Sequence, residues 1–228
     1  MAARALSAAN HHAPPPALPS TSWFDISLAQ WSLHQAFWSG TRDKMRFAAI
    51  AKREFGISNL EYVNQVYLDG FSPAVTTELK TVSDGEGVRN VLIMCDHCGR
   101  LGDPDASKQQ DSVNAHIPWL EAAPQLGCHA IRVNAFSEAT ETYGVQLDRT
   151  AGGLRRLCEL GSTYGLKILI EPHGGLSSNG TWLAALMDLV DHPAVGTLPA
   201  LGNYGDRRQG WSDDAHLSTA RVCPTLRE

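Results

Sequence analysis

The sequence lacks an excess of positive charge, and it lacks any long apolar run. Its 228 residues include 19 Lys and Arg against 24 Asp and Glu, so the net charge is −5 at pH 7. Nucleic-acid surfaces need a basic face, so this balance argues against a nucleic-acid partner. No apolar stretch approaches the ~20 residues that cross a bilayer, so we expect no membrane span. The length suits one domain with a sizeable core.

Cysteine is also scarce. The five cysteines are an odd number without the spacing of a disulfide framework, at Cys95, Cys98, Cys128, Cys158 and Cys223. We interpret them as reduced thiols in a reducing compartment, which favours a cytoplasmic location. Residues 1–22 lack a clear apolar core for a secretory signal, so export is the less favoured alternative.

The two ends of the chain lack the pattern of packed elements. Residues 1–22 are rich in Ala and Pro, and the run Pro14–Pro16 prevents a helix there. Because this stretch has little to bury, we predict a flexible tail. Beyond residue 205 the hydrophobic pattern stops, and we predict an irregular C-terminal tail over 206–228. The folded domain is expected over 23–205.

Between these ends, short apolar runs alternate with amphipathic helical patterns, which is typical of βαβ units and a parallel sheet. A closed (β/α)₈ barrel needs eight units and about 250 residues. The pattern contains six strands, so we predict an α/β fold of the TIM-barrel type that is incomplete, with about six βα units. The expected strands cover 26–33, 60–67, 88–95, 128–135, 166–171 and 195–200, and four of the expected helices cover 43–55, 73–85, 105–125 and 146–164.

Local signals refine these helices. Ser72-Pro73 provides the N-cap and the first-turn proline of the second helix. Pro118 is expected to kink the third helix. The pair Gly152-Gly153 is expected to weaken the fourth helix locally. A fifth helix is expected to begin after a cap at Ser178 or Asn179.

The fifth strand ends in residues that carry chemistry. The apolar run 168–170 is followed at once by Glu171, Pro172 and His173 and then by two glycines. In a parallel α/β protein this is the carboxyl end of the sheet, where sites are built. A carboxylate and an imidazole at that point indicate acid–base or metal chemistry. Glu171 and His173 are therefore the main catalytic candidates.

Several segments in chain order carry a family resemblance. They are Ile26–His34, Glu61–Asn64, Ile131–Asn134 and Glu171–Gly175, together with Gly196–Pro199. As a set they resemble the sugar phosphate isomerase/epimerase family. This is the xylose isomerase-like TIM-barrel group, which also includes endonuclease IV-type enzymes. The resemblance implies a barrel that is truncated at its C-terminal side.

The resemblance also implies a divalent-metal site at the carboxyl end of the barrel. In the family, a Glu of the fifth strand and an Asp of the sixth bind the ion, and a His and a Glu of the last two units complete the site. Glu171 matches the first ligand, whereas Ala200 stands in place of the Asp and Pro172 in place of the usual Asn. The intact family would use Mn, Mg, Co or Zn, and we expect weak or absent binding by this chain.

Each candidate residue also has a structural alternative. Glu171 is expected to be a metal ligand and base, or else a strand-end carboxylate paired with an Arg or a backbone amide. His173 is expected to contact a substrate hydroxyl or carbonyl, or else to be a loop histidine held by the glycine turn. His34, Glu61 and Asn134 either bind substrate in the barrel pocket or cap the barrel as satisfied polar groups.

Other features have structural interpretations. Trp31 and Trp182 are expected to be packing residues rather than a sugar platform. The segment Cys95–Cys98 has the spacing of half a zinc or redox motif, but no second pair follows at finger spacing. Gly174, Gly175 and Gly180 precede a helix whose N-terminus would suit a phosphate, although a flexible loop is the commoner explanation.

Three functions therefore compete. The first is a metal-dependent sugar or sugar-phosphate isomerase or epimerase, which moves a proton next to a carbonyl through an enediolate. The second is an inactive truncated remnant or a sugar-binding module, favoured for this chain by Ala200 and by the two missing units. The third is a nuclease of the endonuclease IV type, which needs more metal ligands and a basic face. The expected partner is a small sugar or sugar phosphate, and open barrel edges predict self-association.

Overall fold

The computed structural model describes residues 24–204. Within this range, six strands form one sheet, with every pair parallel and the strands in chain order. This confirms the predicted parallel α/β fold of the TIM-barrel type with about six βα units. The strands are β1 (Leu28–Ala29), β2 (Asn59–Val63), β3 (Arg89–Met94), β4 (Ala130–Asn134), β5 (Lys167–Glu171) and β6 (Val195–Thr197).

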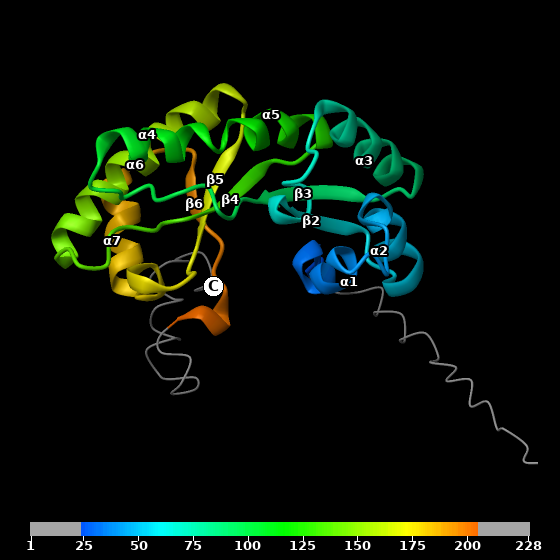
Figure 1. The fold of residues 1–228 in the computed structure, drawn as a ribbon. Coiled ribbons are helices and arrows are strands. Elements are labelled where there is room, and N and C mark those ends of the chain that lie inside the picture. Colours follow the sequence, from blue (N-terminus) through cyan, green and yellow to red (C-terminus); the bar gives the residue numbers. More distant parts are fainter. Residues whose placement is uncertain (1–23, 205–228) are drawn as a thin grey trace, which may run out of the picture.

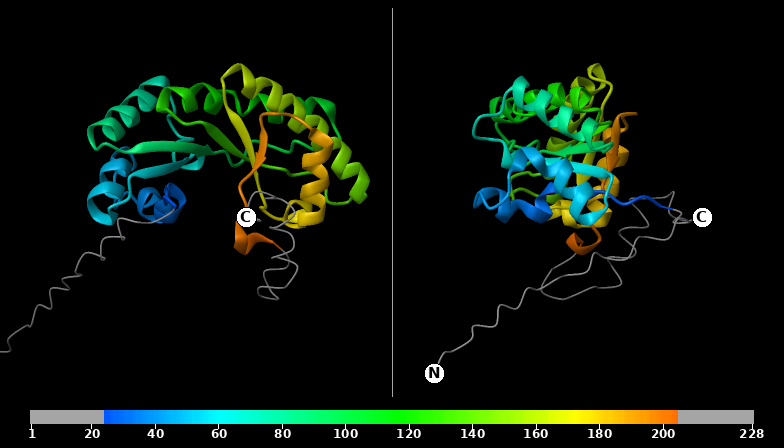
Figure 2. Two further views of the ribbon diagram at one scale, coloured as in Figure 1. Left: turned by 180° about the vertical axis from the view of Figure 1, so that it is seen from behind. Right: turned by 90° about the vertical axis from the view of Figure 1, so that its right-hand side faces the viewer.

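The sheet curves into an arc, and most of the helices lie along its outer side (Figure 1). Figure 2 shows the same arc from behind and from the side. Among the described strands, β1 and β6 each pair on one side only, so the arc is open. No helix in residues 24–204 is long and apolar enough to cross a membrane. The helices are α1 (His34–Trp38), α2 (Phe47–Phe55), α3 (Pro73–Gly85), α4 (Ala106–Asn114), α5 (Ile117–Leu126), α6 (Tyr143–Thr163) and α7 (Gly180–Val190).

The two faces of the sheet differ in burial, as β5 shows. Side chains alternate along a strand, so Ile168 and Ile170 point to one face and Leu169 and Glu171 to the other. Ile168 and Ile170 are fully buried, and Ile168 packs closely against Gly161 of α6. Leu169 and Glu171 lie on the inner face and are only partly buried. The inner face of the open arc is therefore where polar groups remain accessible.

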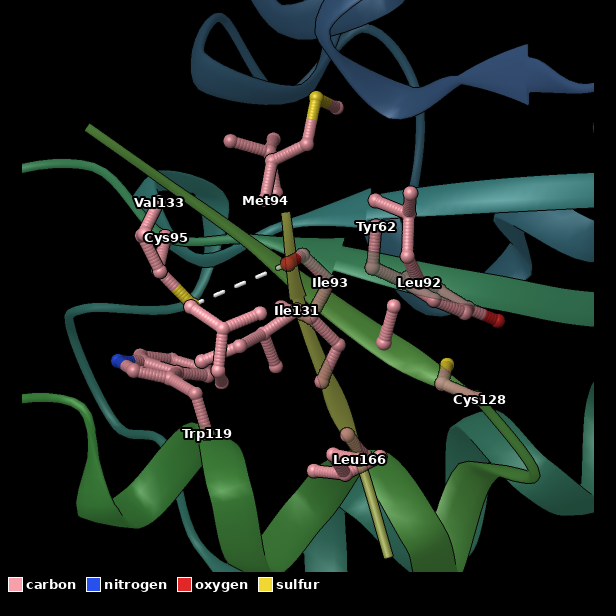
Figure 3. Packing of buried hydrophobic residues seen from close by; sticks show 14 of the residues in the cluster. Tyr62, Leu92, Ile93, Met94, Cys95, Trp119, Cys128, Ile131, Val133 and Leu166 are labelled. Carbon is pink, nitrogen blue, oxygen red and sulfur yellow. Dashed lines mark hydrogen bonds between the residues drawn. The ribbon is translucent and has the colours of Figure 1, made fainter. Parts of the chain in front are cut away.

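The core between the sheet and α5 is closely packed (Figure 3). Trp119 of α5 points toward Cys95 and Ile131, and all three side chains are buried. Burial of each large apolar side chain stabilises the fold by about 1.5–3 kcal/mol. Cys95 is one of four buried free cysteines in the described residues, in agreement with the prediction of reduced thiols, whereas Cys223 lies outside those residues.

The first two strands are shorter than predicted, and Gln30 explains both ends. β1 stops at Ala29 and β2 stops at Val63, and a 3₁₀ helix follows each of them. The buried Gln30 side chain accepts a hydrogen bond from the Val63 backbone N–H at 3.1 Å and donates one to the Tyr67 hydroxyl at 2.7 Å. This carboxamide replaces the backbone pairing that would extend the strands.

The predicted kink at Pro118 is wrong, because two helices replace the single helix expected over 105–125. α4 ends at Asn114 and α5 begins at Ile117. Pro118 occupies the second position of α5, where a backbone N–H would have no helical partner, so proline is tolerated there. The buried His116 lies at the junction, and its Nδ1 lies 2.8 Å from the Ser112 carbonyl oxygen. Because a carbonyl only accepts hydrogen bonds, Nδ1 carries the proton and donates it.

Two other helix starts agree with the sequence. Pro73 is the first residue of α3, although the Ser72 side chain forms no capping hydrogen bond. Asn179 caps α7, since its Oδ1 accepts a hydrogen bond from the Trp182 backbone N–H at 3.0 Å. Proline and asparagine are both favoured at helix starts, where the first backbone N–H groups have no partner within the helix.

The glycine pair in α6 has a packing role in addition to its low helix propensity. The helix is continuous through Gly152 and Gly153. A Cβ on Gly153 would lie 2.0 Å from the Leu101 carbonyl oxygen and 3.2 Å from Gln109 Nε2, whereas a Cβ on Gly152 would meet nothing within 4 Å. Gly153 therefore lets the loop after β3 approach the helix, and Gly152 does not serve this purpose.

Alanine substitutions should separate these two glycines. Gly153→Ala should lower the free energy of unfolding by about 1–3 kcal/mol, because the Leu101 backbone must move. Gly152→Ala should raise it by about 0.5–1 kcal/mol, because alanine is the better helix former. Urea unfolding followed by circular dichroism measures both. Equal effects of the two substitutions would contradict a close approach specific to Gly153.

His116 should make the stability depend on pH. Burial lowers the pKa of His116 to about 4, against the opposing effect of its hydrogen bond to Ser112. An unfolded histidine titrates near 6.5. Because the folded pKa is the lower of the two, the stabilisation is complete above about pH 6.5 and is lost as the pH falls from 6.5 towards 4.

The difference in unfolding free energy between the wild type and His116→Gln isolates this contribution from that of the carboxylates. Between pH 7 and pH 4, the wild type should lose about 3 kcal/mol of unfolding free energy relative to His116→Gln. A difference that stays constant over that range would show that His116 titrates normally in the folded protein.

Candidate active site

Polar side chains gather on the inner face where β3, β4 and β5 end. Asn134 is the last residue of β4, and it pairs in register with Glu171, the last residue of β5. Arg132 lies two residues before Asn134 and therefore on the same face. Asp96 follows the end of β3. These four residues form the centre of the candidate site.

Arg132 is a buried cation between two carboxylates. Its side chain is 5% exposed. Nη1 donates a hydrogen bond to Asp96 Oδ1 at 2.6 Å, and Nε lies 2.7 Å from Glu171 Oε2. The buried Nε–H has no partner in hydrogen-bond geometry, so its contact with Glu171 is a close ion pair. A guanidinium without partners would be strongly unfavourable at this depth, and the two carboxylates offset that cost.

Asp96 is held from several sides. Its Oδ1 also accepts a hydrogen bond from Asn134 Nδ2 at 2.7 Å, and its Oδ2 accepts one from Gln65 Nε2 at 2.9 Å. Its backbone N–H donates to Asn64 Oδ1 at 2.9 Å. Burial is the strongest single influence and raises the pKa of Asp96, but the charge of Arg132 and the hydrogen bonds together hold that pKa below its ordinary value. Asp96 is therefore ionised at neutral pH.

Glu171 presents its second oxygen to the open side of the network. Oε1 accepts a hydrogen bond from Asn203 Nδ2 at 3.1 Å, and His173 Nδ1 lies 3.6 Å from it. The His173 side chain is 39% exposed, against 13% for that of Glu171. The imidazole is therefore the member of this pair that an incoming molecule meets first.

The loop after β5 holds His173 in place. The His173 backbone N–H donates to Ser177 Oγ at 3.0 Å, and the Gly174 backbone N–H donates to Ser178 Oγ at 2.8 Å. Gly174 and Gly175 have φ angles of 107° and 58°, which side chains rarely tolerate. The glycine pair is thus required to turn the chain directly behind His173.

Together, Glu171 and His173 form a carboxylate–imidazole pair suited to proton transfer. An imidazole titrates near neutral pH and exchanges protons readily. The carboxylate lies on the Nδ1 side of the ring, which leaves Nε2 for a substrate. Arg132 in turn fixes the carboxylate through its other oxygen.

The remaining predicted site residues are divided by the structure. Asn134 belongs to the network, as described above. Glu61 lies within β2 rather than at its end, and its Oε1 accepts a hydrogen bond from the Ser27 hydroxyl. His34 begins α1 beyond β1, with three strands between β1 and β5, and its Nδ1 bonds the Trp31 carbonyl oxygen. The structure therefore does not bring Glu61 or His34 into the network around Glu171.

The two tryptophans also differ. Trp182 is fully buried, so its predicted packing role is confirmed. Trp31 is 40% exposed, so it packs against neighbouring rings at the surface rather than in the core. Its ring stacks on His34 with the centroids 4.1 Å apart, and Trp38 meets both rings edge-on. Trp31 lies in a surface helix after β1, which turns its side chain away from the core.

Asp96, Arg132 and Asn203 belong to the network but are not among the site residues that the sequence predicts. The same is true of Asn64 and Gln65, which bind Asp96. Arg132 is a lone charge within the apolar strand Ile131–Val133, and a buried charge requires a partner. Asp96 stands at a strand end, as Glu171 does, but it lies between two cysteines with the spacing of half a zinc or redox motif. Nothing in the sequence indicates that Asn203 reaches back to Glu171.

The described residues do not fit a divalent ion. No three His, Cys, Asp or Glu side chains within residues 24–204 come together as a ligand set. Both oxygens of Glu171 are engaged, one by Arg132 and one by Asn203. Ala200 offers no side-chain ligand. Burial raises the pKa of the Cys98 thiol to about 12, so it is not a ready thiolate ligand.

The fold is similar to those of several solved enzymes. A probable 3-DHS dehydratase involved in petrobactin synthesis from Bacillus anthracis matches with a TM-score of 0.67 and 15% identity, over 88% of this chain and 70% of that one. D-psicose 3-epimerase with D-tagatose, from Clostridium cellulolyticum H10, matches with a TM-score of 0.68 and 15% identity, over 87% and 71%.

A third similar structure contains a metal. It is a xylose isomerase-like TIM barrel protein from Mycobacterium smegmatis in complex with magnesium, with a TM-score of 0.61 and 19% identity over 82% of this chain and 63% of that one. The chain therefore spans between 63% and 71% of the length of these three structures. No curated protein is a significant match.

A family profile described as a xylose isomerase-like TIM barrel matches residues 48–221. This region contains five of the six strands and the whole network around Arg132. The match covers more than half of the sequence and agrees with the parallel sheet of βα units. The chain belongs to the xylose isomerase-like TIM-barrel family.

Proposed function

We propose that this protein is a sugar or sugar-phosphate isomerase or epimerase that moves a proton next to a carbonyl group. The observation that carries the proposal is the pairing of Glu171 with His173 at the accessible end of β5. The fold is shared with an epimerase whose structure contains D-tagatose, which supports a sugar substrate. The proposed site is therefore the inner face of the sheet at the ends of β3, β4 and β5.

In the proposed reaction, His173 removes the proton from the carbon beside the carbonyl. The electron pair of the broken C–H bond forms the enediolate. In isomerisation, protonated His173 returns the proton to the neighbouring carbon while the hydroxyl proton moves to the former carbonyl oxygen. In epimerisation, the same imidazole returns the proton to the opposite face of the carbon after the enediolate turns over. Glu171 stabilises the imidazolium that forms, and Arg132 holds Glu171 at the distance this requires. Because the described residues do not fit a metal, no step is assigned to one.

The second candidate function is a sugar-binding module without catalysis. It is favoured by one observation, which is that both oxygens of Glu171 are already engaged. A pocket at the end of the sheet would then persist while Glu171 serves the fold. The nuclease alternative receives no support from the net charge of −5 or from a ligand set in residues 24–204.

Two further proposals concern the setting of the protein. The buried free thiols favour a reducing, cytoplasmic compartment. Within residues 24–204, the outer edge of β1 pairs with no other strand, which favours self-association through strand edges. Both are independent of the reaction proposed above.

Exchange of deuterium from the solvent tests the proton transfer. In deuterium oxide, the protein should introduce deuterium into a ketose or ketose phosphate at a slow but measurable rate, detected by loss of the proton NMR signal. Glu171→Gln and His173→Gln should each slow the exchange by about 10²–10⁴-fold, because each removes a group from the acid–base pair.

The control is His129→Gln, which replaces an exposed histidine at the opposite end of β4 and should leave the rate unchanged. Exchange no faster than in buffer, by protein that melts cooperatively, would contradict the enzyme proposal. Binding of the ketoses without exchange would then support the sugar-binding module.

Manganese binding tests the electrostatic role of Arg132. The wild type should bind no stoichiometric Mn²⁺ after dialysis, because the guanidinium is already paired with both Asp96 and Glu171. Arg132→Met should lower the unfolding free energy by about 3–5 kcal/mol, since two buried carboxylates lose their partner. Millimolar Mn²⁺ should recover part of this loss in the Met variant.

Arg132→Lys provides the matched control, because it retains the positive charge and should gain no dependence on Mn²⁺. Thermal melts with and without Mn²⁺, together with electron paramagnetic resonance of the bound ion, measure these effects. One equivalent of Mn²⁺ bound by the wild type and lost in Glu171→Gln would show that Glu171 is a metal ligand despite its pairing with Arg132.

A further inference from the structure

A pocket of about 310 Å³ opens beside the candidate catalytic pair. This volume lies at the lower end of the range of small-molecule sites, which is about 300–1,000 Å³. Asn134 lines the pocket and is the register partner of Glu171, and the ring of Phe136 lies 6.2 Å from that of His173. The pocket therefore borders the proposed site through Asn134 and Phe136. Its wall consists of Cys95, His97, Cys98, Gly99, Arg100, His116, Asn134 and Phe136.

His116 contributes a buried hydrogen-bond acceptor to this wall. The residue is 2% exposed, and its Nδ1–H donates to the Ser112 carbonyl oxygen at 2.8 Å. A neutral imidazole that donates through Nδ1 carries its lone pair on Nε2. Burial lowers the pKa of His116 to about 4, so the ring is neutral at pH 7. Within the described residues, no hydrogen bond to Nε2 is present, and His116 is one of the residues that line the pocket.

The charges around the pocket do not favour a phosphate. Arg100 is the one Lys or Arg among the described lining residues, and its Nη1 is paired with Glu138 at 2.6 Å. Asp96 places a negative charge behind Asn134, to which it is hydrogen bonded. His97 lies exposed at the rim, and Phe136 adds an apolar ring. These groups suit a neutral molecule with hydroxyl groups.

We propose that this pocket binds the unphosphorylated, hydroxyl-bearing end of an open-chain sugar, with one sugar hydroxyl donating a hydrogen bond to His116 Nε2. The inference deepens the proposed function and rests on it for the placement of the carbonyl beside His173. A six-carbon ketose with its carbonyl at that position extends its remaining carbons past Phe136 into the pocket. A three-carbon ketose has no carbons left to do so. The pocket thus selects substrates by length and by the absence of a terminal phosphate.

The test compares D-fructose, D-fructose 6-phosphate and dihydroxyacetone by saturation-transfer NMR with the full chain. D-fructose should bind more tightly than its 6-phosphate. His116→Leu should weaken D-fructose binding about tenfold, the effect of one lost hydrogen bond. The same substitution should change the affinity for dihydroxyacetone by no more than about twofold, since that sugar makes no contact with His116. His116→Gln should restore most of the affinity, because its amide both donates to Ser112 and presents an oxygen to the pocket.

A second measurement uses the wild type and so does not depend on whether the variants fold. In protein labelled with ¹⁵N-histidine, the Nε2 signal of His116 should shift on addition of D-fructose and also of meso-erythritol, a polyol without a carbonyl. Tighter binding of the 6-phosphate than of D-fructose would overturn the inference, as would an Nε2 signal that neither D-fructose nor meso-erythritol moves. A shifted signal without solvent exchange would instead reject the proposed reaction while supporting the pocket.

Discussion

The burial of one guanidinium organises the carboxyl end of this sheet. Arg132 lies within β4, where every residue is buried. Its charge is tolerable there only with partners of opposite charge. Asp96 comes from the loop after β3 and Glu171 from the end of β5, so one side chain ties three neighbouring strands together. The positions of the catalytic candidates and of the adjacent pocket follow from this arrangement.

The same network links the two halves of the site. On one side, Arg132 is paired with one oxygen of Glu171, and the other oxygen lies 3.6 Å from His173 Nδ1. On the other side, Asp96 accepts a hydrogen bond from Asn134, which forms part of the pocket wall. Two carboxylates and one guanidinium leave the centre with one net negative charge. That charge disfavours an anionic ligand, so a neutral sugar suits this end of the sheet.

The family resemblance and the geometry lead to different expectations for Glu171. The resemblance implies a metal ligand, whereas the structure shows the alternative that the sequence left open, a strand-end carboxylate paired with an arginine. Ala200 is consistent with this difference, because the sixth strand contributes no carboxylate nearby. In its place, Asn203 reaches Glu171 from the same segment. The Asn203 amide and the Arg132 guanidinium therefore occupy the space around the Glu171 carboxylate that a metal ion would need.

The sequence by itself determined the strand order, the alternation of strands with helices, the parallel sheet and the location of Glu171 and His173, because these follow from local periodicity and from where an apolar run ends. Element boundaries depended on tertiary contacts, as Gln30 shows by ending both β1 and β2. The partners of Arg132 were decided only by the fold, since register places Asp96, Arg132 and Glu171 side by side although they are far apart in the chain. Periodicity predicts on which face of the sheet a side chain lies, whereas strand register and sheet curvature determine which side chains it contacts there.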